Sequence, residues 1–489
     1  MKSTGSRAES WAWRSVAVVA VALAALLLME RWQSGPVQLG KRERQPVAPT
    51  GIVGSDSERL ARADRVIGNA EGQLDAASGQ SQQPVSLTGI SSSYADAMAR
   101  TDLGITNAKA QVATASDQWL LHENVARNYV ERARLSGNYD DYAAADASLK
   151  RAFAVARPGT GPHLVRAQLD FGMHRLAEAE RYLTLIEGYA IPSLPDERAE
   201  ILGMRGDIAF YRGDLKTALN LYEEADRTSP GTATFRRAIY AMKTGDFESA
   251  GIYFNQTERE ARLPPLQLRA YIELQRGILD LERGNWPSAE NWFRKADRTF
   301  PGYWLTQAHL VQMWALRGNV AQAERGYRQI IARSQQPDVM DALAALYRFQ
   351  GNAAASRLWA ERSAAIWAKR LQQWPEAAYA HALEHDLVLG NPATALALAR
   401  KNMAARPYGD SATMLGWALL ANNRPAEARA LLERLNRTPW RTAQQYVALS
   451  QANAMLGDSE RSDAARDAAL KINPRAFDPA APLIWFGHH

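Results

Sequence analysis

A turn residue recurs along this chain at a nearly constant spacing, and that spacing constrains the fold more than any other feature. The ten turn residues are Gly137, His174, Gly213, Gly245, Gly284, Gly318, Gly351, Gly390, Asn423 and Gly457. Successive gaps are 37, 39, 32, 39, 34, 33, 39, 33 and 34 residues. A period near 34 residues is typical of stacked pairs of short helices. The spacing predicts an all-α superhelical solenoid of about ten helix-turn-helix repeats.

The residues around these turns follow an ordered pattern. One unit contains Leu202, Gly206, Gly213, Leu215, Ala218, Tyr222, Ala225 and Pro230, and another contains Gly277, Gly284, Trp286, Ala289, Phe293, Ala296 and Pro301. Small residues let two helices approach closely, and the proline ends the second helix because it has no N–H to donate. The pattern resembles the tetratricopeptide repeat (TPR) family over residues 117–475. The resemblance implies a protein-binding scaffold that is not an enzyme and needs no cofactor.

Composition excludes several other classes of protein. The net charge is +6, but positive and negative residues are interspersed along the repeats. We therefore expect no nucleic-acid partner, because that function needs clustered basic residues. The chain has no cysteine, which excludes disulfides, Cys-ligated zinc and thiol catalysis.

An apolar segment near the N-terminus predicts a membrane anchor. Residues 15–29 carry no charge, and Trp11 to Trp32 would form a helix about 33 Å long at about 1.5 Å per residue. We assign residues 1–14 to a short tail and 15–32 to a single transmembrane helix. With the repeats, this resembles bacterial membrane-anchored TPR proteins. A signal peptide cleaved near Ala22–Ala24 is the alternative.

Basic residues flank the segment in nearly equal numbers on its two sides, so the count of positive charges barely favours either orientation. A very short tail before a first span most often stays cytoplasmic. We therefore expect an inner-membrane protein with periplasmic repeats, acting in cell-envelope assembly, secretion or polysaccharide export. A cytoplasm-facing, membrane-tethered regulator is the alternative.

The remaining segments are a flexible linker at 33–56, N-terminal capping helices at 57–116, the repeat array at 117–475 and a C-terminal tail at 476–489. Two similar amphipathic stretches, which begin at Leu60 and Met98, support the capping helices. We expect the apolar tail at Leu483–Phe486 to dock on the last repeat, with display to a partner as the alternative.

The TPR resemblance implies that partner proteins bind in a concave groove lined by the first helix of each repeat. By position, the lining residues are Asp207, Phe210, Tyr271, Leu274, His309, Gln312, Arg348, His381, Glu384 and Trp417. Aromatic side chains often anchor such interfaces. We expect no small-molecule substrate.

One short motif favours a different function. His381, Glu384 and His385 form an H-x-x-E-H pattern, in which the two histidines lie on one helical face and Glu384 could act as a general base. A zinc enzyme is therefore a further hypothesis. No third ligand follows at a suitable spacing, and we predict no bound metal.

Overall fold

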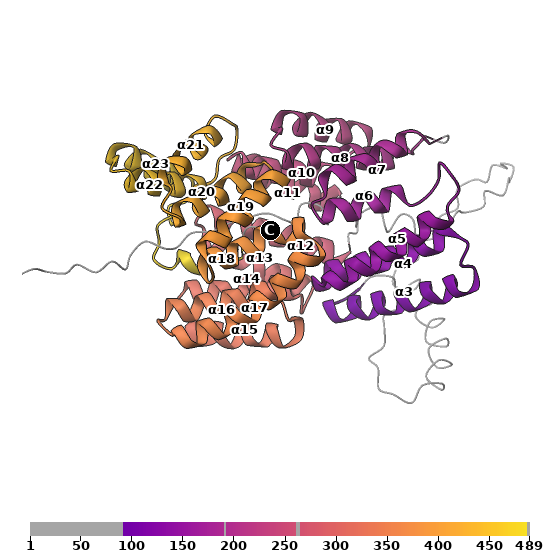
Figure 1. Ribbon diagram of the computed structural model, residues 1–489, viewed down its shortest axis with the longest axis horizontal. Helices are drawn as coiled ribbons and strands as arrows, with labels where there is room; N and C mark the ends of the chain where they lie inside the picture. Colours follow the sequence, from indigo (N-terminus) through magenta and orange to yellow (C-terminus); the bar gives the residue numbers. More distant parts are fainter. Residues whose placement is uncertain (1–90, 190–191, 261–264, 487–489) are drawn as a thin grey trace, which may run out of the picture.

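Helical hairpins make up nearly all of the described chain (Figure 1). The computed structural model describes residues 91–189, 192–260 and 265–486. These ranges contain 21 α-helices and no β-strand. Helix α3 (Tyr94–Thr114) comes first, and ten hairpins follow it. The prediction of an all-α solenoid of about ten helix pairs is confirmed.

Each hairpin is a pair of consecutive helices packed around a short turn, and we number the hairpins one to ten along the chain. They are α4–α5 (Trp119–Ser136, Tyr139–Val155), α6–α7 (His163–Gly172, Leu176–Glu187), α8–α9 (Pro195–Tyr211, Leu215–Thr228), α10–α11 (Thr234–Lys243, Phe247–Glu260), α12–α13 (Leu266–Glu282, Trp286–Thr299), α14–α15 (Trp304–Leu316, Val320–Ser334), α16–α17 (Pro337–Phe349, Ala353–Gln373), α18–α19 (Pro375–Val388, Pro392–Ala405), α20–α21 (Gly409–Ala421, Pro425–Leu435) and α22–α23 (Ala443–Met455, Ser459–Ile472).

All ten predicted turn residues lie in the turns of these hairpins. Nine of them have a positive φ, between 55° and 80°, which is the left-handed conformation that ends many helices. His174 and Asn423 stand where glycine is usual, and both adopt this conformation. Gly390 is the exception: there the carboxylate of Asp386 accepts a hydrogen bond from the backbone N–H of Asn391 at 3.1 Å.

Small residues inside the hairpins have the packing role that the sequence predicts. A Cβ atom on Gly206 would lie 2.5 Å from the ring of Tyr222, and one on Gly277 would lie 2.3 Å from the ring of Phe293. Both distances are too short for non-bonded carbon atoms, since such contacts are optimal at about 3.5–4.0 Å. The aromatic ring of the second helix therefore needs a glycine on the first helix.

The superhelix closes on itself about every five hairpins. The turn of the first hairpin contacts the loop that follows the sixth hairpin. The turns of the second to fifth hairpins contact, in the same way, the loops that follow the seventh to tenth hairpins. Four of these pairs touch directly, and they are Ser136 with Gln336, Gly213 with Pro407, Lys243 with Arg441, and Gly284 with Asn473. In the remaining pair, Met173, beside the turn of the second hairpin, lies in the same apolar cluster as Trp374, which follows the seventh hairpin. Successive turns of the superhelix therefore pack against each other.

The C-terminal segment packs along the superhelix. A short 3-10 helix, η2 (Ala481–Leu483), contacts α14 and α16. Phe486 is fully buried. The tail docks, as the sequence predicts, but the expectation that it docks on the last repeat is wrong. Its site is the sixth and seventh hairpins, because the chain leaves α23 beside the turn at Gly284 and continues onto them.

The N-terminal predictions lie largely outside the described residues. The tail at 1–14, the anchor at 15–32, the linker at 33–56 and the first capping stretch all belong to residues 1–90. No helix in the part of the chain that the structure describes is long and apolar enough to cross a membrane. The second capping stretch lies within α3, which packs on α4. At the start of α3, the N–H of Tyr94 donates to the carbonyl oxygen of Pro301 at 3.0 Å.

Candidate functional site

Seven of the ten predicted groove residues are buried inside the protein. These are Asp207, Phe210, Tyr271, Leu274, His309, Gln312 and Glu384. The packing of successive superhelical turns fills the space that a more open solenoid would leave along its first helices. The expectation that these side chains line an open groove is therefore corrected, while their part in partner binding stays untested.

Asp207 belongs to a buried ionic network. Its carboxylate accepts hydrogen bonds from Arg236 at 2.8 Å and from the hydroxyl of Tyr222 at 3.0 Å, and Arg236 also pairs with Glu200 at 3.0 Å. Burial raises the pKa of Asp207 and of Glu200, and Arg236 opposes that shift. The network joins the third and fourth hairpins, so its role is structural.

Phe210 links two turns of the superhelix. Its ring centroid lies 5.5 Å from that of Trp440 and 6.2 Å from that of Tyr408. Tyr271 is held within its own helix, where its hydroxyl accepts a hydrogen bond from Gln275 at 3.0 Å. These aromatic side chains are core residues, and Leu274 beside Tyr271 is buried with them.

Gln312 and His309 bind an extended segment, and that segment is the chain's own tail. The amide oxygen of Gln312 accepts hydrogen bonds from the N–H groups of Trp485, at 2.7 Å, and of Phe486. Its amide nitrogen donates to the carbonyl oxygen of Phe486 at 2.6 Å. The ring of Phe486 lies 5.7 Å from that of His309. A single side chain of α14 therefore holds three backbone groups of an extended segment.

The H-x-x-E-H motif faces two carboxylates of the preceding hairpin. His381 Nδ1 lies 2.9 Å from Asp338, and its ring stacks on Trp367 with centroids 5.4 Å apart. His385 Nδ1 lies 2.8 Å from Asp341. Each of these ring nitrogens therefore contacts a carboxylate of α16. No group of three or more metal-ligating side chains within the described ranges could hold a metal ion.

Asp341 and Ser363 were not predicted as part of a site. Asp341 accepts a hydrogen bond from Ser363 and one from the indole N–H of Trp367 at 2.8 Å, while it also contacts His385. The sequence carries a signal for this cluster: Asp338 and Asp341 lie three residues apart on one helix, and the two histidines lie four apart on another. Matching those two helices requires the tertiary contact of α16 with α18.

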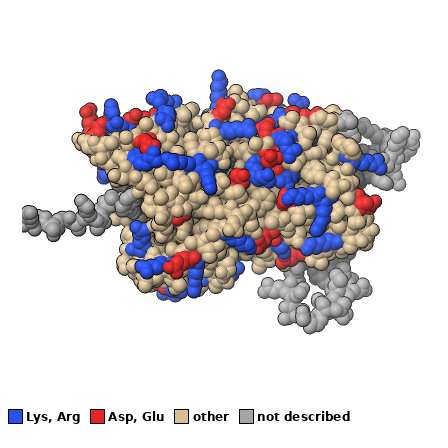
Figure 2. All heavy atoms as spheres, in the orientation of Figure 1, with Lys and Arg blue, Asp and Glu red and all other residues tan. Residues whose placement is uncertain are grey.

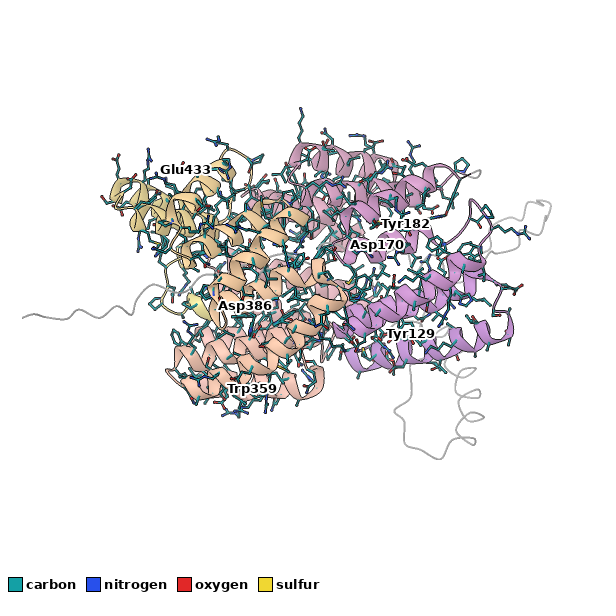
Figure 3. The ribbon with its side chains drawn as sticks, in the orientation of Figure 1. Tyr129, Asp170, Tyr182, Trp359, Asp386 and Glu433 are labelled. Atoms are coloured by element: carbon teal, nitrogen blue, oxygen red, sulfur yellow. The ribbon has the colours of Figure 1, made fainter. Side chains whose placement is uncertain are left out.

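His385 also forms part of an open cleft, which we name the α17–α18 cleft. It has a volume of about 630 Å³, and its polar lining includes Arg348, Ser356, Arg357, Glu361, His385 and Asp386. Ser356 and His385 are buried. The guanidinium of Arg348 donates to the carbonyl oxygen of Val388. Asp386, labelled in Figure 3, is half-buried on α18. A volume of this size suits a small ligand or a few side chains of a partner.

Two charged residues of opposite sign lie on the rim of this cleft. Arg357 and Glu361 are exposed, and neither has an ion-pair partner within residues 91–189, 192–260 and 265–486. A second cleft, of about 650 Å³, lies between α5, α6 and α7. Most of its charged side chains form ion pairs, for example Lys150 with Asp146 at 2.7 Å. We take the α17–α18 cleft as the candidate binding site because these exposed charges lie beside the buried polar side chains of Ser356 and His385.

The three remaining residues of the predicted groove, Arg348, His381 and Trp417, are exposed or half-buried. Trp417 is half-buried and packs beside the apolar clusters of the last hairpins. Arg348 is exposed and lies in the α17–α18 cleft. Over the face that Figure 2 shows, basic and acidic side chains are interspersed. The accessible part of the predicted set is therefore Arg348, His381 and Trp417.

The described part of the chain is a repeat of helical hairpins with left-handed turn residues and glycine–aromatic pairs of the TPR kind. No protein-family model and no curated protein matches the chain. A tetratricopeptide repeat protein from Parabacteroides merdae ATCC 43184 is 15% identical, covers 54% of this chain and 98% of its own, and has a TM-score of 0.32. A chain of the APC/C hetero-tetramer Cut9-Hcn1 is 13% identical, and the match covers 80% of this chain and 83% of that one, with a TM-score of 0.35. The human IFIT1 dimer with PPP-AAAA is 15% identical, and the match covers 76% of this chain and 94% of that one, with a TM-score of 0.35.

Proposed function

We propose that this chain is a protein-interaction scaffold that holds a partner in the α17–α18 cleft. The observation that carries the proposal is the cleft itself, where Arg357 and Glu361 flank a buried polar floor formed by Ser356 and His385. Unpaired charges of opposite sign favour a partner segment that carries both signs, because such a segment could pair with each of them. The rigid hairpins lower the cost of ordering on the scaffold's side.

The tail supports the same proposal from another part of the array. Gln312 on α14 holds the backbone of Trp485 and Phe486. A first-helix side chain of this array is thus able to bind an extended segment through the backbone. In the α17–α18 cleft, we propose that other first-helix side chains, among them Arg348 on α16 and His385 on α18, contact the partner.

Site-specific crosslinking in the native cell tests this binding site. A photo-crosslinking amino acid at Arg357 should give a discrete protein adduct. The same amino acid at Ile252, which is 53% exposed on α11 and lies outside the cleft, should not. Charge reversal by Glu361→Lys should weaken the adduct at position 357. Equal adducts at positions 357 and 252, or no effect of Glu361→Lys, would contradict the proposal.

We further propose that residues 15–32 tether the scaffold to the inner membrane with the repeats in the periplasm. Support comes from the uncharged run at 15–29 and the tryptophans beside it. Envelope assembly, secretion and polysaccharide export are the processes that such a tethered scaffold would serve. Paired reporter fusions at the C-terminus, one active only after export and one only in the cytoplasm, test this topology. A cytoplasmic C-terminus would instead support the membrane-tethered regulator.

A further inference from the structure

A third cleft lies between the fifth and sixth hairpins. Helices α13, α14 and α15 form its walls, and its volume is about 430 Å³. Four residues of α14 line it, namely Gln307, Leu310, Val311 and Trp314. Their spacing of three and four residues places them on one face of the helix. Gln312, which holds the tail, lies on the other side of α14, so this cleft is separate from the tail site. We name it the α13–α15 cleft.

Arginine side chains dominate the charge of the α13–α15 cleft. Arg294, Arg298 and Arg333 line it, and all three are exposed. Asp297 is the one carboxylate among the lining residues that the structure describes, and it accepts a hydrogen bond from Gln307 at 3.2 Å. The lining therefore carries a net positive charge, which attracts an anionic ligand.

Two of these arginines have no ion-pair partner in the described ranges. Arg294 pairs with Glu290 of its own helix. Neither Arg298 nor Arg333 forms an ion pair within residues 91–189, 192–260 and 265–486, although they lie on different helices and line the same cleft. A guanidinium presents a planar set of N–H donors that matches a carboxylate. The cleft thus offers two carboxylate-binding groups from two helices.

The rest of the lining is largely apolar. Leu310 and Trp314 are half-buried, while Val311 and Ile330 are buried. A Cβ atom on Gly326 would lie 2.6 Å from Val311 and 3.1 Å from Trp314, so this glycine lets α15 lie close against α14. An apolar side chain of a ligand would cover the accessible parts of Leu310 and Trp314, and burial of that surface is favourable.

We propose that the α13–α15 cleft binds an acidic segment of a partner protein, in which aspartate or glutamate residues flank an apolar side chain. The carboxylates would pair with Arg298 and Arg333, and the apolar side chain would cover Leu310 and Trp314. An inorganic anion would leave the apolar lining uncovered. A nucleic acid fits less well, because it needs a longer stripe of basic side chains than one cleft supplies. This site shares no lining residue with the α17–α18 cleft and does not depend on it.

Peptide selection tests the chemistry of the partner. Full-length protein in a nonionic detergent is immobilised and used to select from a library of random peptides displayed on phage. Binders are first depleted on the double variant Arg298→Gln with Arg333→Gln, which should keep the fold because both side chains are exposed. We expect the selected peptides to combine acidic with apolar residues. No enrichment over the double variant, or selected peptides without acidic residues, would contradict the proposal.

The affinity of a selected peptide then tests the place of binding. By fluorescence anisotropy, the double variant should bind the peptide about tenfold more weakly, as the loss of two exposed ion pairs predicts. Arg325→Gln is the matched control, since Arg325 is exposed on α15 but does not line the cleft. Arg357→Gln, which removes a charge from the α17–α18 cleft, should also leave the affinity unchanged. An equal loss with either control would overturn the assignment to this cleft.

The ligand itself supplies two further arms. Changing the acidic residues of the peptide to their amides should abolish binding, and changing its apolar residue to serine should weaken it. Amide peptides that bind as tightly as the acidic ones would contradict the role of the arginines. A single-stranded uridine oligonucleotide that binds more tightly than the peptide, and loses its binding in the same double variant, would place a nucleic acid in the cleft and overturn the proposal.

Discussion

A Cβ atom on Gly213 would lie 2.6 Å from the carbonyl oxygen of Pro407, which belongs to a loop five hairpins further along the chain. Gly213 therefore meets two requirements at once. Its φ of 77° is in the left-handed region, which side chains disfavour, and the next superhelical turn leaves no room for a methyl group. Gly457 has almost the same φ, 78°, but faces open space.

These two glycines provide a matched pair of variants. Gly457→Ala should cost about 1–2 kcal/mol, which is the penalty of the left-handed conformation alone. Gly213→Ala should cost a further 1–3 kcal/mol or so, because the loop at Pro407 must move to admit the methyl group. Urea denaturation followed by circular dichroism measures both. Equal losses would mean that the loop at Pro407 does not lie against Gly213.

The side chain of His174 predicts a loss of stability in mild acid. His174 is 1% exposed and its ring nitrogens have no hydrogen-bond partner within the described residues. Burial, and then the charges of Arg406 and His381, lower its pKa well below its usual value. Below pH about 6.5, the unfolded chain binds a proton that the folded chain does not, so stability falls as the pH falls.

The variant His174→Asn tests this assignment. Asparagine tolerates a left-handed φ, as Asn423 shows with its φ of 55°. We expect a smaller difference in unfolding free energy between pH 7.5 and pH 5 in the variant than in the unmodified protein. The same pH dependence in both proteins would show that another group causes the acid sensitivity.

Asp410 should have the opposite effect on the pH dependence. Burial raises its pKa to about 7, although Lys243 at 3.5 Å opposes the shift. Between the unfolded pKa of about 3.9 and pH 7, the folded chain binds more protons than the unfolded chain. The contribution of Asp410 to the free energy of unfolding therefore falls as the pH rises from about 3.9 to 7. Asp410→Asn should remove that part of the slope, and thermal melts at half-unit pH steps would detect it. An unaltered slope would refute the raised pKa.

Removing the side chain of Gln312 should release the tail. Gln312→Ala leaves the N–H of Trp485 and the N–H and carbonyl oxygen of Phe486 without their partner, at a cost of about 1–3 kcal/mol for each group that stays buried. We expect faster amide hydrogen exchange at these two residues. Gln307→Ala on the same helix is the control, since the side chain of Gln307 bonds only Asp297, at 3.2 Å, among the described residues. Exchange that responds equally to both variants would argue against the Gln312 contact.

The hairpins could be predicted from the sequence because each depends on nearby residues. The turn residues and pairs such as Gly206 with Tyr222 lie within one repeat, so their spacing is visible in the sequence. The burial of the predicted groove residues could not be predicted in this way. It depends on the superhelical twist, which brings Ser136 to Gln336, and the sequence does not encode that twist at any single position.

The candidate site shows the same division. The motif at His381 and His385 is visible in the sequence, where a zinc enzyme was only a further hypothesis. The carboxylates of Asp338 and Asp341 that these histidines contact lie on a different helix, so the sequence alone does not pair them. The apolar tail at Leu483–Phe486 was correctly expected to dock. Its position on α14 depends on where the last hairpin ends relative to the sixth, which is again a property of the superhelix.

The closure of the superhelix is tested most directly by a crosslink between Asp140 and Lys369. The Nζ atom of Lys369 lies 2.7 Å from the Asp140 carboxylate, and both side chains are more than half exposed. In the cysteine-free chain, Asp140→Cys with Lys369→Cys should form an intramolecular crosslink with a short bis-maleimide at high dilution, and lose it in urea. Failure to crosslink under native conditions, with both cysteines fully reactive toward a single maleimide, would contradict the closed superhelix.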